Sequence, residues 1–169
     1  SKSGLGFSPR RITVSSVGFP KFIKKMADQK IKFNLAISLH SAIQSVREFL
    51  MPFSNKILIE DLIDSLRYWI NIKKSIITFE YIVFDGINDS EKDIIELIKI
   101  CKKIPSKVNL IQYNSINDDN FRNASIKSIN RYSKLLSENN IINTIRKSRG
   151  DDIDAACGQL ANNTLNLKN

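Results

Sequence analysis

Hydrophobic positions in this chain alternate between two periods, which predict strands separated by helices. Short apolar or β-branched runs, which are typical of buried strands, occur at 11–17, 33–40, 75–84, 107–114 and 141–150. Apolar residues at helical spacing, which favour amphipathic helices, occur at 19–29, 45–53, 59–72, 91–104 and 126–139. A last short helix is predicted at 153–160.

The alternation of strands and helices predicts an α/β fold with right-handed crossovers and a parallel sheet. Ser90 is a predicted N-cap, whereas Pro52 is expected to interrupt one helix and Pro105 to end another. The pattern does not separate part of a (βα) barrel from an open sheet. In both folds, ligands bind where the strands end, at their C-terminal edge. We expect residues 1–161 to form the domain and residues 162–169 to be a disordered tail.

Small polar residues follow the predicted strands at that edge. They are Ser15, Ser16 and Gly18 after the first strand, Ser38 and His40 after the second, and Asn114 after the fourth. Together they predict a site for a ligand that is rich in hydrogen-bond donors and acceptors. The simpler explanation is that serine and asparagine often begin loops.

The remaining candidate chemistry is limited to one histidine and two cysteines. His40 lacks partners at metal-ligand spacing, so a hydrogen-bonding role is expected rather than a metal site. Cys101 falls on the apolar side of a helix and is predicted to be core. Cys157 lies in the polar segment DDIDAACGQL and is a candidate nucleophile. Neighbouring arginines and lysine favour its thiolate, whereas neighbouring aspartates oppose it.

Composition and charge narrow the class of protein. With 169 residues, 42% hydrophobic and 25% charged, the chain has the composition of a soluble globular domain, and no apolar run approaches the roughly 20 residues that span a membrane. A net charge of +9 favours a polyanionic partner such as a nucleic acid, although a lysine-, asparagine- and isoleucine-rich composition can also produce it. Two distant cysteines favour a reducing cytoplasm.

Several motifs resemble the radical S-adenosylmethionine RNA methyltransferases that methylate C2 of adenine in 23S rRNA and tRNA. These motifs are RRITVSSVG, LAISLH, LMPF, FEYIVFDGINDS, KVNLIQYN and RKSRGDDIDAACGQLA, and the resemblance covers residues 4–161. A sister family that methylates adenine C8 of rRNA shares IDAACGQL but is less similar at FEYIVFDGINDS and RKSRGDD, so it is the second alternative.

The resemblance implies a partial (βα) barrel of the radical S-adenosylmethionine type that lacks its first strands. It implies that S-adenosylmethionine lies across the C-terminal rim, with contacts from Ser15, Ser38, Leu39, His40 and Asn114. The resemblance also implies that Cys157 accepts a methyl group, and that a radical formed at a 4Fe–4S cluster drives its transfer to adenine. An electron donor such as flavodoxin, and a cytoplasmic location, are further implications.

The sequence departs from the family in one respect that matters for activity. The 4Fe–4S cluster needs the three thiolates of a CxxxCxxC motif, and this chain lacks that motif. We therefore expect the cluster ligands upstream of residue 1, and we expect no metal ligand within the chain. A fragment, half of a split gene and a decayed remnant all remain open. The alternative from another class is an inactive basic RNA-binding module that uses Arg122, Lys127, Arg131 and Lys134.

Overall fold

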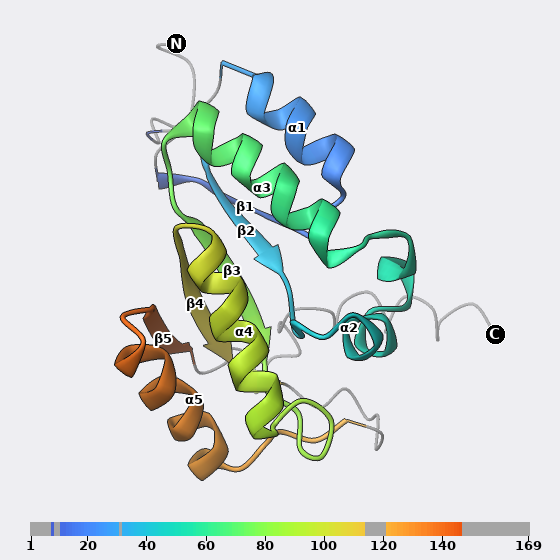
Figure 1. Cartoon of the computed structure of the whole chain (residues 1–169). Helices are drawn as coiled ribbons and strands as arrows, with labels where there is room; N and C mark the ends of the chain where they lie inside the picture. The colour runs from blue at the N-terminus through green and yellow to red at the C-terminus, as the bar shows by residue number, and fades with distance from the viewer. Residues whose placement is uncertain (1–7, 9–10, 31, 114–120, 147–169) are drawn as a thin grey trace, which may run out of the picture.

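The computed structural model describes residues 8, 11–30, 32–113 and 121–146, and its elements are labelled in Figure 1. The strands are β1 (Thr13–Ser16), β2 (Asn34–Ser38), β3 (Ile77–Ile82), β4 (Ser106–Ile111) and β5 (Ile142–Arg146). The helices are α1 (Pro20–Asp28), α2 (Gln44–Leu50), the 3-10 turn η2 (Pro52–Lys56), α3 (Ile59–Lys73), α4 (Glu91–Lys103) and α5 (Ile126–Glu138).

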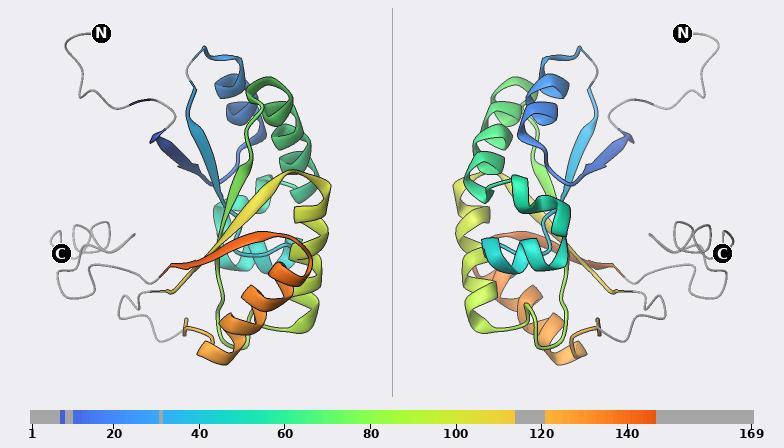
Figure 2. Two further views of the ribbon diagram at one scale, coloured as in Figure 1. Left: turned by 90° about the vertical axis from the view of Figure 1, so that its left-hand side faces the viewer. Right: turned by 90° about the vertical axis from the view of Figure 1, so that its right-hand side faces the viewer.

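The strands form one parallel sheet in the order in which they occur along the chain, β1-β2-β3-β4-β5. Within the described residues, the helices gather on a single face of this sheet (Figure 2). A doubly wound open sheet carries helices on both faces, whereas a (βα) barrel places all of them outside. The sheet is therefore a section of a barrel, which confirms the predicted fold class.

The core lies between the sheet and the helices that cover it. Leu35, Ile37, Phe79, Tyr81 and Val108 alternate along the central strands and are buried on the covered face. Such alternation places every second side chain on the same face of a strand. The opposite face of the same strands is left to residues of different chemistry, and it is there that the candidate site lies.

Local sequence signals set the bounds of several helices as predicted. The Ser90 hydroxyl accepts from the Asp93 backbone N–H, and the Asp93 side chain accepts from the Ser90 backbone, which forms a capping box at the start of α4. Pro52 ends α2 and begins η2. Cys101 is only 7% exposed on the core side of α4, so its predicted core position is confirmed.

Two predictions about the C-terminal segment, a short helix at 153–160 and a disordered tail at 162–169, lie outside the described residues. The end of the fifth predicted strand, beyond Arg146, does so as well. Among the described residues, no helix combines the length and the apolarity that crossing a membrane would require.

Candidate functional site

Polar side chains line the face of the sheet that the helices leave open. Ser38, Glu80, Asn109 and Thr144 occupy adjacent positions across four parallel strands. The Thr144 hydroxyl donates to Asn109 Oδ1 at 2.7 Å. A row of hydroxyl, amide and carboxylate groups is unusual in strands that are otherwise so apolar, and it provides many hydrogen-bonding groups on what would be the inner face of a barrel.

Glu80 connects this row to the first strand. The Ser15 hydroxyl donates to Glu80 Oε1 at 3.5 Å, although 65 residues separate the two. Strand β2 lies between them, and its residues on the open face, Ala36 and Ser38, have small side chains that leave room for the contact. Ser15 and Ser38, both predicted from the sequence, therefore lie near the same carboxylate, since Glu80 contacts Ser15 and pairs with Ser38 across β2 and β3.

The segment after β2 is held against the end of β3 by its backbone. The carbonyl of Glu80 accepts from the N–H groups of Leu39 at 3.0 Å and His40 at 3.3 Å. The Leu39 side chain is fully buried in the core, and its carbonyl accepts from the Ser41 N–H at 2.7 Å, so only the second lone pair of that carbonyl is left for a ligand. His40 has φ +53, a left-handed conformation that costs about 1 kcal/mol or more in a residue with a Cβ.

Asn88, in the loop between β3 and α4, fixes that left-handed turn. Its side-chain amide donates to the carbonyl of His40 at 2.6 Å and to that of Ile82 at 2.9 Å. Its Oδ1 accepts from the Phe84 backbone N–H at 2.6 Å. Asn88 is completely buried, and its one side chain satisfies three backbone groups at the rim, of which the Phe84 N–H is buried and the two carbonyls are partly buried.

His40 is held in its neutral form. Burial lowers its pKa to about 4, and the nearby positive charge of Arg47 contributes in the same direction. Its Nδ1 accepts from the Ile82 backbone N–H at 3.2 Å, so the ring proton resides on Nε2. At neutral pH the imidazole is therefore uncharged, with an Nε2–H that can donate a hydrogen bond.

Arg47 of α2 is a fully buried cation beneath the same rim. Its Nη2 donates to the carbonyl of Val17, just after β1, at 2.7 Å. Within the described residues its Nε and Nη1 have no partner, and burial lowers the pKa of the guanidinium. Gly18 follows with φ +100, and a Cβ there would come within 2.8 Å of Leu62. Arg47 and Gly18 therefore fix the turn that leaves β1.

The depressed pKa of His40 predicts a specific acid sensitivity. Unfolding restores the ordinary pKa of 6.5, so protons favour the unfolded chain between about pH 6.5 and 4. Stability that is present above pH 6.5 should fall by roughly 3 kcal/mol as the pH approaches 4. Chemical unfolding at both pH values should show this loss in the wild type and a smaller loss in His40→Asn, since asparagine tolerates a left-handed backbone. Parallel pH profiles for the two proteins would contradict this explanation.

The structure places the predicted site residues unequally. Ser15, Ser38, Leu39 and His40 lie at the rim of β1 and β2, whereas Asn114 and Cys157 lie outside the described residues. Sequence reasoning did not identify Glu80, Asn88 or Arg47 as part of the site. A signal for Glu80 was present, because a carboxylate inside the apolar run ITFEYIVF requires a polar surface to face.

The described residues include no group of three histidine, cysteine, aspartate or glutamate side chains that could hold a metal ion. The alternative basic face near α5 is partly neutralised, since Arg131 pairs with Glu91 at 3.0 Å and Lys134 approaches Glu138 at 3.8 Å. The rim of β1, β2 and β3 is thus the better candidate site in the part of the chain that the structure describes.

The chain is similar in sequence to bacterial proteins that are named as RNA methyltransferases. It is 53% identical over 165 residues to a Flavobacterium psychrophilum protein and 53% identical over 162 residues to a Christiangramia forsetii protein, both named "Probable dual-specificity RNA methyltransferase RlmN". The alignments cover 98% and 96% of this chain but 48% and 46% of those proteins. The chain therefore spans about half the length of the curated relatives it matches, in their C-terminal part. No protein-family model matches the chain.

A solved structure is similar over the same region. The crystal structure of a radical SAM methyltransferase from Sphaerobacter thermophilus is 37% identical and superposes with a TM-score of 0.89. The match covers 94% of this chain and 47% of that one. Sequence and fold thus agree that the chain matches about half the length of these relatives.

Proposed function

We propose that this chain forms the cofactor-binding rim and the methyl-carrying segment of an RNA methyltransferase. The premise is that the chain is homologous to the C-terminal part of the RlmN RNA methyltransferases. The proposed reaction is methylation of adenine C2 in 23S rRNA and tRNA. The proposed cofactor is S-adenosylmethionine, and the partners are the RNA, the N-terminal half of the enzyme and an electron donor such as flavodoxin. The proposed location is the cytoplasm, where these partners meet.

The observation that carries the proposal is the polar rim formed by Ser15, Ser38 and Glu80 beside the neutral His40. S-adenosylmethionine presents ribose hydroxyls, an adenine edge and an ammonium group, and the rim offers hydroxyl groups, an imidazole N–H and a carboxylate to meet them. We propose that Ser15, Ser38, His40 and the Leu39 backbone hold this cofactor, together with Asn114. When bound, it supplies the methyl group and the radical that this chemistry requires.

The 4Fe–4S cluster does not fit this chain. Three cysteine thiolates hold such a cluster when S-adenosylmethionine takes the fourth iron, and the whole sequence has only Cys101 and Cys157. Cys101 is buried in the core, where its pKa is raised to about 11 by burial. The cluster is therefore proposed to belong to the N-terminal half of the enzyme, and the chain's own residues bind, orient and carry the methyl group.

Cys157 is the proposed carrier of that methyl group. A thiol can act as a nucleophile only as its thiolate, and the raised pKa of Cys101 keeps that thiol protonated at neutral pH. Cys101 also lies on α4, which covers the other face of the sheet (Figure 2). Neither property suits a methyl carrier. The motif IDAACGQL, through its resemblance to the methyltransferase family, assigns that role to Cys157.

Aromatic side chains near the same rim support a nucleobase substrate. The Phe84 ring lies 5.2 Å from both Tyr113 and Phe121, and Phe49 stands 6.1 Å from Phe121. Phe49 is 61% exposed, so much of its ring surface is accessible to a ligand. Proteins that bind unpaired RNA bases stack them on such rings, so a displaced adenine has an apolar surface beside the proposed cofactor.

The test is to produce the chain together with the N-terminal half of the Flavobacterium psychrophilum relative. Peptide mass spectrometry should find a methyl group on Cys157 and none on Cys101. Nucleoside analysis of the RNA should find 2-methyladenosine. An unmodified Cys157 in a preparation that makes 2-methyladenosine would reject its proposed role, and 8-methyladenosine in place of the C2 product would reject the proposed position of methylation.

A further inference from the structure

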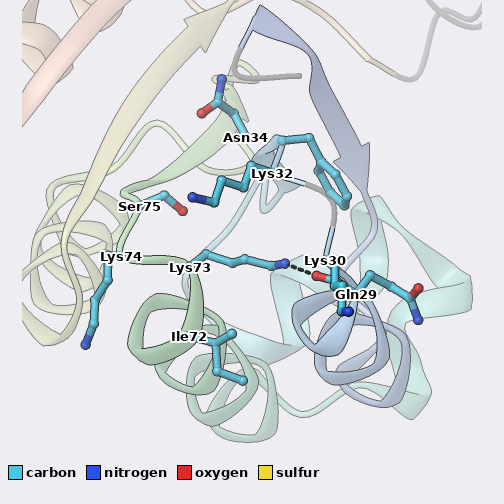
Figure 3. A pocket seen from close by; sticks show the side chains of 9 residues that line it. Gln29, Lys30, Lys32, Asn34, Ile72, Lys73, Lys74 and Ser75 are labelled. Carbon is cyan, nitrogen blue, oxygen red and sulfur yellow. Dashed lines mark hydrogen bonds between the residues drawn. The ribbon is translucent and has the colours of Figure 1, made fainter. Parts of the chain in front are cut away.

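A pocket at the N-terminal edge of the sheet is lined by lysines and by no carboxylate. Its volume is about 590 Å³, and it lies where α1 and α3 end and where the chain enters β2 and β3. The ionisable residues in its lining are Lys30, Lys32, Lys73 and Lys74. In Figure 3, Lys32 and Lys73 extend across the pocket from opposite sides, and Lys74 points outward from its edge.

The ends of two helices do not account for this much positive charge. Each helix C-terminus carries a partial charge of about −0.5, so α1 and α3 together offset roughly one lysine. Lys73 serves this purpose, because its Nζ donates to the Gln29 carbonyl at the end of α1. The other lysines remain in excess, and Lys32 belongs to neither helix. Among the described ion pairs, none includes Lys30, Lys32 or Lys74.

Two other pockets of the described residues are also lined by lysines, but each of them contains carboxylates as well. One contains Lys99 and Lys103 with Glu60 and Glu96, and the other contains three lysines with Asp61 and Asp64. In both, carboxylates accompany the lysines. Asp28, at the end of α1, accepts a hydrogen bond from the Tyr68 hydroxyl at 2.8 Å and does not line the lysine pocket.

We propose that this lysine pocket binds the phosphodiester backbone of the RNA, at a position separate from the rim where the adenine is methylated. Lysine ammoniums favour phosphate oxygens as point-charge partners, and Gln29, Asn34 and Ser75 add amide and hydroxyl groups to the lining. The lining holds one aromatic ring, Phe33, which packs against Trp69 with 5.3 Å between the ring centroids. Because this ring already has a stacking partner, the pocket is better suited to phosphates than to bases. The proposal rests on the proposed function for the identity of the polyanion.

One RNA molecule can contact both the lysine pocket and the rim. Asn34 in its lining begins β2 and Ser38 at the rim ends it, and four residue steps along a strand span about 13 Å. Double-stranded RNA-binding domains contact phosphates along duplexes of about 16 base pairs. A stem held at the lysine pocket can therefore present an unpaired adenine from its loop at the rim.

The experiment measures binding of a fluorescent RNA hairpin with a stem of about 16 base pairs and an adenine-containing loop, across a range of salt concentrations. The triple variant Lys30→Gln, Lys32→Gln, Lys74→Gln should bind at least ten-fold more weakly at low salt. The magnitude of the slope of log affinity against log salt should fall by about 2–3, because each of the three lost phosphate contacts removes about 0.7–0.9. Lys73 is kept, since it joins α3 to α1.

A matched control removes the same charge from the exposed side of α4, as Lys92→Gln, Lys99→Gln, Lys102→Gln. It should weaken binding less than three-fold and keep the salt slope. Equal losses in both variants, or no RNA binding by the wild type, would overturn the proposal. Displacement of the RNA by pyrophosphate at equal phosphate concentration would assign the pocket to small anions instead.

The same variants separate this proposal from the proposed function. Methylation of Cys157 in the reconstituted enzyme needs no RNA contact at the pocket, so the pocket variant should keep it while losing RNA affinity. Unmethylated Cys157 in the wild type would contradict the proposed function and leave the measured RNA affinities as the test of the pocket. Loss of Cys157 methylation in the pocket variant alone would contradict a role confined to RNA binding.

Discussion

Replacement of Cys157 by alanine is expected to reduce 2-methyladenosine formation below detection in the reconstituted enzyme. The proposed mechanism passes the methyl group through this sulfur, so its removal leaves no alternative carrier. Enzymes that lose a covalent nucleophile lose about 10³-fold or more of their rate. Nucleoside mass spectrometry of RNA after a single long incubation measures the loss, and methylated RNA at wild-type levels would refute the role.

Cys101→Ala is the matched control for that substitution. Cys101 is 7% exposed in the core, and burial raises its pKa to about 11, so its thiol does not take part in the proposed reaction. Loss of its sulfur leaves a small cavity that should cost about 1 kcal/mol of stability. Product formation at a temperature well below unfolding should therefore stay within two-fold of the wild type.

The elements of the fold were predictable because each carries its own local signal. The capping box of Ser90, the break at Pro52 and the continuous apolar run of β2 depend on residues near one another in the chain. The choice between a barrel section and an open sheet was not predictable in this way. It depends on which face each helix covers, and the periodicity of a helix is the same on either face.

The candidate site was predictable in part, for a related reason. Ser15 and Ser38 stand at strand ends, and parallel strands bring their ends to one edge. Glu80 and Asn88 were missed because their contacts join distant parts of the chain, over 65 residues to Ser15 and 48 residues to His40. Arg47 similarly reaches the Val17 carbonyl over 30 residues. Pairings of this kind follow from the three-dimensional arrangement and leave no periodic trace in the sequence.

Among the described side chains, Asn88 is expected to have one of the largest effects on stability when truncated. Asn88→Ala removes the partners of the His40 carbonyl, the Ile82 carbonyl and the Phe84 N–H at once. A buried backbone group left without a partner costs about 1–3 kcal/mol. The Phe84 N–H is buried and the two carbonyls are partly buried, so a loss of roughly 3 kcal/mol is expected. Chemical unfolding measures it, with the exposed Asn130→Ala on α5 as a control that should change stability by less than about 0.5 kcal/mol.

The same substitution should also release His40. The backbone of residue 88 stays anchored, because its carbonyl accepts from the Tyr132 hydroxyl, so the change is confined to the side chain's contacts. Without the Asn88 amide, the left-handed turn at His40 loses the bond that offsets its strain, and water reaches the imidazole. Its pKa should then rise from about 4 toward 6.5, which NMR titration of the single histidine can follow. An unchanged pKa together with full stability would show that Asn88 does not hold the rim in place.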